Sequence, residues 1–274
     1  MKIIENEVIF LSSELDEASI NIKKKLIENY GFTERGVFNG KPLYVKENIT
    51  ILTIDSEHIH FNTLEDIARA QLVIVLSKHT AQSKIPTLTA HFTGNWGSKN
   101  DYGGQPRTLS IAPASKLKIA LTTMRKLANE YSLNWSVSME VTHHGPTLKN
   151  TPILFVEIGS TIEQWKDPIA AEIVATAAIS AAEDNRVFKT MVGFGGSHYA
   201  PRFNHYIFDT DIAIGHVAPE YVFNEITENE IILAFKRTLE KTNTAAIDWK
   251  GLKGSYRSSL VDVLKRNGME FIKA

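Results

Sequence analysis

Short apolar segments alternate with segments of helical spacing along the whole chain of 274 residues. The clearest apolar segment is LVIVL at residues 72–76, and such a continuous run suits a strand that is buried on both faces of a parallel sheet. Helical spacing is clearest over residues 116–131, where Leu117, Leu121 and Met124 recur at intervals of three or four. The alternation predicts an α/β fold of three layers (α/β/α) with a mixed, largely parallel sheet.

The same patterns predict the remaining elements. Strands are expected at residues 8–12, 43–45, 49–54, 72–76, 88–92, 135–141, 153–158, 190–194, 206–208, 212–214 and 269–272. Helices are expected at residues 13–30, 64–70, 116–131, 168–182, 228–241 and 255–267. Neither an internal repeat nor a Pro/Ser-rich linker interrupts the pattern. We therefore expect one compact domain over residues 1–274, in which the basic C-terminal segment 236–274 is the one place for a subdivision.

The composition excludes several classes of protein. Cysteine is absent, so the chain has no disulfide, thiol nucleophile, thiolate zinc site or iron–sulfur cluster. The first seven residues are too acidic for a signal peptide. The most apolar stretch, residues 169–182, contains Glu172 and is shorter than the roughly 20 residues that span a bilayer. We expect a cytoplasmic protein.

Charge is distributed unevenly along the chain. The formal net charge is -1, but residues 236–274 contain nine basic and four acidic residues and carry 9 − 4 = +5, which leaves -1 − 5 = -6 for the rest. The basic excess is explained either by solvated helix faces or by a phosphate-binding surface. Residues 249–257 favour the second explanation, because Lys250, Lys253 and Arg257 lie among glycines and aromatics in what resembles a loop entering a helix.

The histidines fall at the predicted strand ends. His79 follows residues 72–76, His91 closes residues 88–92, His143 and His144 follow residues 135–141, and His198 follows residues 190–194; Glu157 lies at the end of residues 153–158. If these strands are parallel, the side chains line one edge of the sheet, where open α/β sheets bind ligands. A metal held by imidazoles and carboxylates would supply a water for hydrolysis. Alternatively, His143 or His198 acts as a general base oriented by Glu157.

A glycine-rich segment follows the predicted strand at residues 190–194. Its sequence, GFGGSH, lacks the third glycine of a dinucleotide fingerprint, the lysine of a phosphate-binding loop and the nucleophile elbow of serine hydrolases. The amides of Gly195, Gly196 and Ser197 are candidates to bind an oxyanion or a phosphate. A tight turn after a strand explains the glycines equally well.

Several segments together resemble the archaeal- and plant-type D-aminoacyl-tRNA deacylase family. The specific ones are HFTGNWG at residues 91–97, VTHHGPT at 141–147 and GFGGSHYAPRF at 193–203, and they are accompanied by SKH at 77–79, VEIGST at 156–161 and GHV at 215–217. The resemblance covers almost the whole chain. It implies a fold similar to the phosphorylase/peptidyl-tRNA hydrolase class and hydrolysis of the ester between a D-amino acid and the tRNA 3′ ribose. The products would be free tRNA and a D-amino acid, a quality-control step in translation. The resemblance also implies a monomer with about two zinc ions.

The residues and the resemblance together give a candidate site. We expect His143, His198 and Glu157 to be catalytic, and the metal-ligand candidates are His143, His144, Glu157, His198, His91 and His216, with His79 ranked after them. The substrate-binding candidates are Gly195, Gly196, Ser197, Trp96, Tyr199, Lys250, Lys253 and Arg257, the aromatics by stacking on the terminal adenine. We expect neither a membrane nor an obligate protein partner. Two alternatives stay open, a zinc peptidase or amidase of the same fold class and a non-catalytic RNA-binding module.

Overall fold

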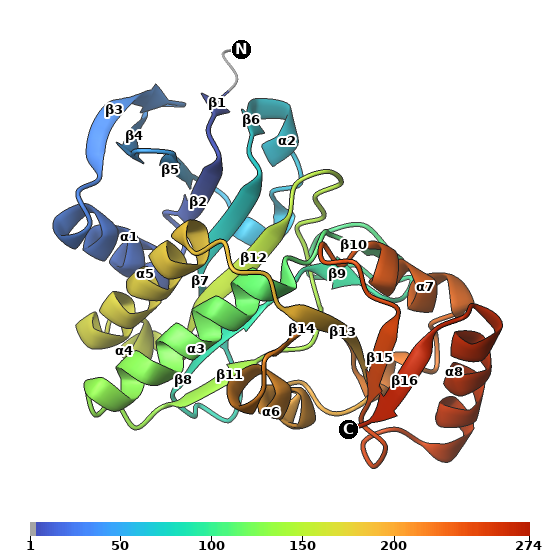
Figure 1. Ribbon diagram of the computed structural model, residues 1–274. Helices are drawn as coiled ribbons and strands as arrows, with labels where there is room; N and C mark the ends of the chain where they lie inside the picture. The colour runs from blue at the N-terminus through green and yellow to red at the C-terminus, as the bar shows by residue number, and fades with distance from the viewer. Residues whose placement is uncertain (1–3) are drawn as a thin grey trace.

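The computed structural model describes residues 4–274 (Figure 1) and contains a large mixed sheet. Its eight strands lie in the order β11-β8-β12-β7-β2-β5-β4-β3. They are β2 (Val8–Ser13), β3 (Thr33–Phe38), β4 (Lys41–Lys46), β5 (Ile49–Ile54), β7 (Leu72–Thr80), β8 (Thr87–His91), β11 (Ser136–Met139) and β12 (Ile153–Ser160). Four of the seven pairings are parallel, which confirms the predicted mixed, largely parallel sheet.

The directions of two strands differ from the expectation. Strands β12, β7, β2 and β5 are parallel, whereas β8 pairs antiparallel with β12, and β11 runs parallel to β8. The carboxyl ends of β8 and β11 therefore lie at the opposite edge from those of β7 and β12. The prediction that all the histidine-bearing strand ends share one carboxyl edge is wrong, because a run of apolar residues does not encode strand direction.

Three helices cover one face of this sheet: α1 (Glu17–Asn29), α3 (Ala114–Glu130) and α5 (Pro168–Glu183) (Figure 1). Helix α5 begins where the Asp167 side chain accepts the amides of Ile169 and Ala170, and its alanines allow close packing on α3. Leu154, Val156 and Ile158 of β12 point to this helical layer and share its core. Because side chains alternate along a strand, Phe155 and Glu157 point to the other face.

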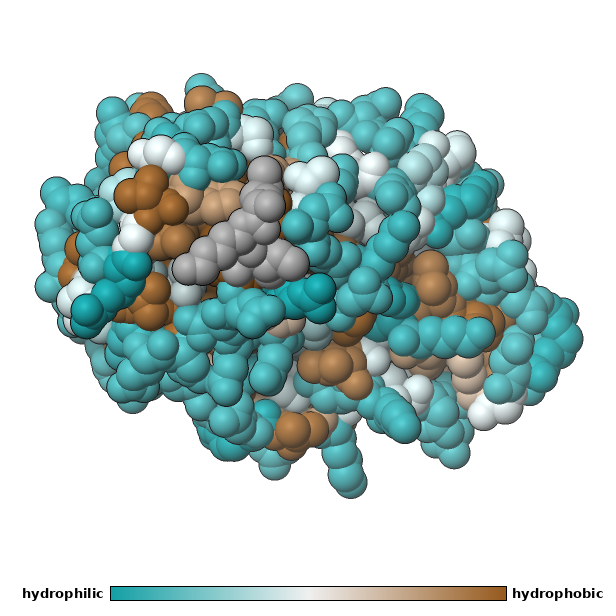
Figure 2. All heavy atoms as spheres, turned by 90° about the horizontal axis from the view of Figure 1, so that it is seen from above, coloured by the Kyte–Doolittle hydropathy of each residue, from teal (hydrophilic) through white to brown (hydrophobic). Residues whose placement is uncertain are grey.

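The opposite face is covered by shorter elements. Helix α2 (Leu64–Ile67), the 3₁₀ turn η1 (His58–His60) and the short paired strands β1 (Ile4–Glu5) and β6 (Ala68–Arg69) lie there, and Ile153 and Phe155 pack against Leu64 and Leu148. The surface seen from above is mostly hydrophilic, with apolar residues in separate small groups (Figure 2). No helix within residues 4–274 is both long and apolar enough to cross a bilayer.

A second sheet of four parallel strands follows in the chain, in the order β14-β13-β15-β16. The strands are β13 (Lys189–Phe194), β14 (Ile212–Ala218), β15 (Thr244–Ile247) and β16 (Glu270–Lys273). Helix α6 (Pro201–Asp209) covers one face, and α7 (Glu228–Lys236) and α8 (Gly254–Arg266) cover the other. The predicted strand at residues 206–208 is wrong, because Pro201 starts a helix in which Phe203 and Ile207 form one buried stripe.

Backbone hydrogen bonds join the two sheets next to the histidine-rich segments. The Val141 amide donates to the carbonyl of His198 at 3.0 Å, and the Thr142 amide donates to that of Val217 at 3.0 Å. A further pairing, β9 (Gly94–Asn95) with β10 (Thr108–Leu109), orders the glycine-rich loop beside them. The loop after β11 is thereby held between the two sheets.

Candidate active site

Three strands of the large sheet present polar side chains on the face opposite the long helices. His79 of β7, His91 of β8 and Glu157 of β12 lie there, since Glu157 pairs with Ser77 and Thr89 in adjacent strands. Glu157 stands in the middle of β12, which continues to Ser160, and is only 3% exposed. The prediction that it lies at a strand end is wrong, although it does belong to the cluster.

Two loops complete the cluster from above this face. Glu140, His143 and His144 follow β11, and His198 follows β13 of the second sheet. The first loop is fixed by the Gly94 amide, which donates to the carbonyl of His144 at 2.8 Å. Gly94 has a φ of +155°, and a Cβ there would lie 2.6 Å from the Leu109 side chain, so only glycine allows this close approach.

Glu140 is the centre of one half of the cluster, and the sequence interpretation did not include it. Its buried carboxylate lies 3.0 Å from His79 Nδ1, 2.8 Å from His198 Nε2 and 3.5 Å from His143 Nε2. The available signal was weak: a glutamate in an apolar strand, three residues before His143.

The charge of Glu140 sets the protonation of its neighbours. Burial lowers the pKa of His79 and of His198, but the hydrogen bond and charge of Glu140 outweigh burial and raise both values. Burial opposes ionisation of Glu140 itself, yet the two histidines hold the pKa of its carboxyl well below the usual range. Glu140, His79 and His198 thus form a charged, proton-holding group.

The other half of the cluster consists of neutral imidazoles. Burial lowers the pKa of His91 to about 4 and that of His144 to about 3, and it holds that of His143 well below its usual value. Each Nδ1 donates to a backbone carbonyl: His91 to Phe92 at 3.1 Å, His143 to Val141 at 2.7 Å and His144 to Gly145 at 2.6 Å. These bonds fix the tautomer in which Nε2 carries the free lone pair.

This donor set fits a transition metal such as zinc. Three groups have ligand atoms within 4.8 Å of one another: His91, His143 and His144; His79, Glu140 and His198; and His91, Glu140 and Glu157. His91 Nε2 is buried and has no hydrogen-bond partner among the described residues, which leaves this atom available as a ligand. Imidazole and carboxylate ligands are those expected of a zinc site without cysteine.

Glu157 gives a pH-dependent prediction for the metal-free protein. Burial and the charge of Glu140 raise the pKa of Glu157 to about 8, whereas an unfolded glutamate titrates near ~4.3. Between about pH 4.3 and about pH 8, Glu157 therefore keeps a proton in the folded chain that it releases in the unfolded chain. The free energy of unfolding falls as the pH rises through this range. We expect Glu157→Gln to be more stable than the unmodified protein at about pH 9 and similar to it near about pH 4.

The measurement is thermal unfolding with a chelator over that pH range. Glu130→Gln is the matched control, because Glu130 is exposed at the end of α3. Parallel stability curves for Glu157→Gln and the unmodified protein would show that Glu157 is ionised in the fold.

The structure places two of the predicted site residues, His216 and Trp96, away from the cluster and one, Tyr199, at it. His216 is fully buried and bonded through Nδ1 to Thr142 Oγ1 and through Nε2 to the Ser110 carbonyl, both at 3.0 Å, and belongs to none of the ligand groups. Trp96 is only 3% exposed and donates its indole N–H to the Thr142 carbonyl, so it offers no face for stacking. Tyr199 lies at the cluster, where its hydroxyl contacts His79 Nε2 at 2.9 Å.

Two of the predicted anion-binding amides are already occupied. The Gly195 amide donates to the Ala218 carbonyl at 2.8 Å, and the Gly196 amide donates to the Gly251 carbonyl at 2.9 Å. The prediction that these two amides bind an oxyanion is wrong, and the tight-turn explanation holds for them. The Ser197 amide has no such backbone partner within residues 4–274, and its residue is exposed.

The basic candidates of the tail differ in the contacts that they make. Lys250 and Lys253 are exposed in the loop between β15 and α8, and Lys253 Nζ pairs with Glu220 Oε1 at 2.9 Å. Arg257 instead donates to the Trp249 carbonyl and stacks on the Trp249 ring, with 5.1 Å between guanidinium and ring centre. Arg257 therefore holds this loop together and is less available for phosphate than the two lysines.

The fold and this cluster define an α/β protein with a buried group of histidine and glutamate side chains. Comparison with known proteins identifies its family. The profile of the family described as D-aminoacyl-tRNA deacylase matches residues 67–272. A D-aminoacyl-tRNA deacylase of Thermococcus kodakarensis is 39% identical over 97% of this chain and 99% of its own length. One of Methanosarcina acetivorans is 32% identical over 98% of this chain and 92% of its own.

A solved structure agrees with these relatives. The crystal structure of a conserved protein of unknown function, AF0625, superposes with a TM-score of 0.90 at 29% identity, covering 98% of this chain and 95% of that one. The chain belongs to the D-aminoacyl-tRNA deacylase family.

Proposed function

We propose that this chain hydrolyses the ester that joins a D-amino acid to the 3′-terminal ribose of tRNA. The observation that carries the proposal is the buried cluster: three neutral imidazoles with free Nε2 atoms stand beside a carboxylate that holds two protonatable histidines. The imidazoles would hold a Lewis-acidic metal and the carboxylate–histidine group would carry protons, and both functions promote ester hydrolysis. Membership of the family supports tRNA as the substrate.

The mechanism assigns separate roles to the two halves of the cluster. His91, His143 and His144 would hold zinc, while His79, Glu140 and His198 form the proton-holding group beside it. Zinc, when bound, supplies Lewis acidity and lowers the pKa of water. His198 is the most accessible member, with 35% of its side chain exposed. We assign to it the removal of a proton from the attacking water and its delivery to the ribose oxygen, with Glu140 holding the ring in place.

Hydrolysis of D- and L-aminoacyl-tRNA by the purified protein tests the function. We expect the D-ester to be hydrolysed and the L-ester to be spared. His198→Ala should lower kcat by roughly 10²- to 10⁴-fold, the usual loss for an acid/base group. His205→Ala is the matched control, because His205 is exposed on α6, where it pairs with Asp209 and lies beside the Tyr206 ring. Full activity in His198→Ala would remove His198 from the mechanism.

The same assay separates the two alternatives. A peptidase or amidase would cleave small peptides and would not need tRNA. A non-catalytic RNA-binding module would retain D-aminoacyl-tRNA intact at high protein concentration with zinc added. Neither alternative accounts for the whole cluster together with the matched family.

The lysines of the β15–α8 loop give a prediction on salt dependence. Each phosphate contact contributes about one unit to the slope of log affinity against log salt. Because Arg257 is engaged with Trp249, we expect the Lys250→Ala/Lys253→Ala double variant to flatten the slope by about 2 and to raise KM with kcat nearly unchanged.

The measurement is tRNA affinity as a function of salt. Lys24→Ala/Lys126→Ala is the matched control, because both lysines are exposed on α1 and α3 and pair only with a glutamate one turn away. An equal slope in the two double variants would place the tRNA on another surface.

We also propose that residues 1–274 act as one domain, since the site takes His198 from the second sheet and its other members from the first. The sequence-based predictions of a monomer and of a cytoplasmic location agree with a tRNA substrate.

A further inference from the structure

A crevice of about 620 Å³ lies at the carboxyl ends of three parallel strands of the second sheet. Gly196 and Ser197 follow β13, Glu220 and Tyr221 follow β14, and residues 248–253 follow β15, and all of these segments line the crevice. None of the roles assigned above to the His/Glu cluster requires this space.

The strand order makes this crevice a natural ligand site. Strands β13 and β15 are neighbours, but the chain leaves them toward opposite faces of the sheet. After β13 it enters α6, whose Phe203 packs with Met191, and after β15 it enters α8, whose Leu260 packs with Val192. The two loops diverge, and such switch points are where open parallel sheets bind ligands.

The Asp248 carboxylate leaves one oxygen available in this crevice. Asp248 is 5% exposed, its Oδ1 accepts the Gly251 amide at 2.8 Å, and its Oδ2 has no hydrogen-bond partner among residues 4–274. A Cβ on Gly251 would lie 2.3 Å from Oδ2, and one on Gly196 would lie 3.0 Å from it. Both glycines are needed to leave this acceptor uncovered, which is the arrangement that binds hydroxyl groups.

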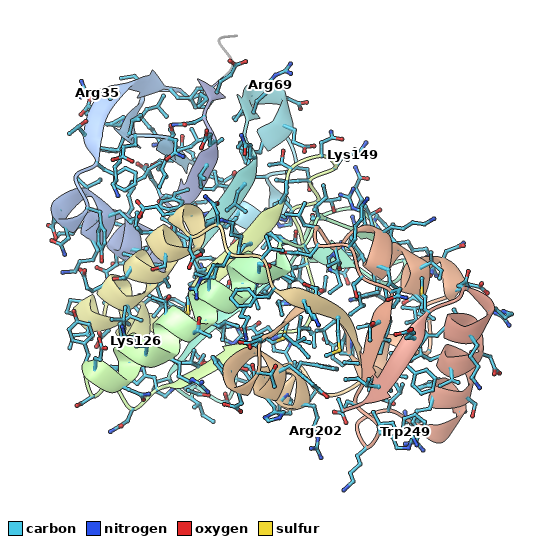
Figure 3. The ribbon with its side chains drawn as sticks, viewed as in Figure 1. Arg35, Arg69, Lys126, Lys149, Arg202 and Trp249 are labelled. Atoms are coloured by element: carbon cyan, nitrogen blue, oxygen red, sulfur yellow. The ribbon has the colours of Figure 1, made fainter. Side chains whose placement is uncertain are left out.

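The opening of the crevice carries groups suited to phosphate and to an aromatic base. Lys250 and Lys253 are exposed there, and Lys253 Nζ lies 2.9 Å from Glu220 Oε1. Tyr221 is 54% exposed and offers a free ring face. Figure 3 shows Arg202 of α6 and Trp249 of the β15–α8 loop projecting on the same side of the molecule.

The crevice adjoins the catalytic cluster. Ser197 lines it, and the next residue, His198, contacts Glu140 at 2.8 Å. A polymer bound in the crevice can therefore present its end to the cluster.

From these observations we propose that the crevice binds a ribonucleotide of the tRNA 3′ end, with Asp248 accepting a ribose hydroxyl, Lys250 and Lys253 facing a phosphate, and a base stacking on Tyr221. This inference rests on the proposed function and names the subsite that delivers the ester to the cluster. It assigns to Asp248 the distinction between RNA and DNA at this position.

The test uses the ribotrinucleotide CCA and the deoxyribotrinucleotide of the same sequence, titrated into the unmodified protein by calorimetry. We expect CCA to bind at least about tenfold more tightly, since a hydrogen bond to a charged acceptor is lost with the hydroxyl. The amide resonances of Gly196 and Gly251 should shift on binding of CCA. Equal affinities, or binding that leaves both amides unshifted, would overturn the proposal.

Two variants separate the contribution of Asp248 from that of Tyr221. Asp248→Asn keeps an acceptor for the Gly251 amide and should remove the preference for CCA, whereas Asp262→Asn, the same charge change at an exposed position of α8, should retain it. Tyr221→Ala should weaken both trinucleotides about equally, by roughly tenfold. If Asp248→Asn fails to fold, the comparison of the two trinucleotides on the unmodified protein still tests the proposal.

Neither trinucleotide carries an aminoacyl ester, so binding is independent of hydrolysis. Hydrolysis of D-aminoacyl-tRNA without CCA binding in the crevice would overturn this inference alone. CCA binding without hydrolysis would overturn the proposed function alone.

Discussion

Replacing Glu140 by Gln is expected to lower kcat/KM for D-aminoacyl-tRNA by roughly 10²- to 10⁴-fold, the range for loss of acid/base function. The carboxylate contacts His79, His198 and His143, and its charge raises the pKa of the first two. Glutamine has nearly the same shape but no charge, so His79 and His198 would lose their counter-ion.

The measurement is steady-state hydrolysis alongside circular dichroism, to verify that the fold is retained. Glu130→Gln makes the same chemical change at an exposed position and should leave the rate unchanged. A Glu140→Gln enzyme that keeps more than about a tenth of the activity would show that Glu140 has a structural role only.

The second prediction with a large expected effect concerns the zinc content of histidine variants. We expect the unmodified protein to bind zinc at His91, His143 and His144, and we expect His144→Ala to lose this ion and His79→Ala to keep it. The reason is that His144 belongs to the ligand group with His91 and His143, whereas His79 belongs to the proton-holding group with Glu140 and His198. Loss of one of three protein ligands removes the ion, whereas loss of His79 leaves this ligand group complete.

Metal analysis after dialysis against zinc, with native mass spectrometry, measures the content without reference to activity. His60→Ala is the control, because the His60 side chain is 54% exposed in η1. A chelator should abolish hydrolysis and added zinc should restore it. An ion retained in His144→Ala, or lost in His79→Ala, would mean that the ligand group is assigned incorrectly.

Much of the candidate site could be predicted from the position of histidines relative to strands. His79, His91, His143, His144 and His198 all lie in the cluster. Glu140 was missed because its role depends on contacts with His79 and His198, which are 61 and 58 positions away in the chain. Trp96 was misassigned because aromatic residues at a site and in a core have the same composition, and only burial distinguishes them.

The fold class followed from the alternation of strands and helices, but the arrangement of the strands did not. The antiparallel direction of β8 relative to β12 depends on long-range pairing that local patterns do not specify. It places His91 opposite Phe155, near the middle of β12, and so brings the cluster onto a face of the sheet. The separate four-stranded sheet was also not anticipated, since the run at residues 244–247 is too short and alanine-rich to resemble a strand.

The position of His198 has a consequence for synthesis of the chain. Its loop is anchored by the Gly195 amide on the Ala218 carbonyl and by the Gly196 amide on the Gly251 carbonyl. A ribosome produces these carbonyls well after the strands that carry His79, His91 and Glu157. The growing polypeptide therefore contains most residues of the cluster long before the loop that carries His198 is fixed. Esterase activity should appear only when translation has passed residue 251, and chains released earlier should be inactive.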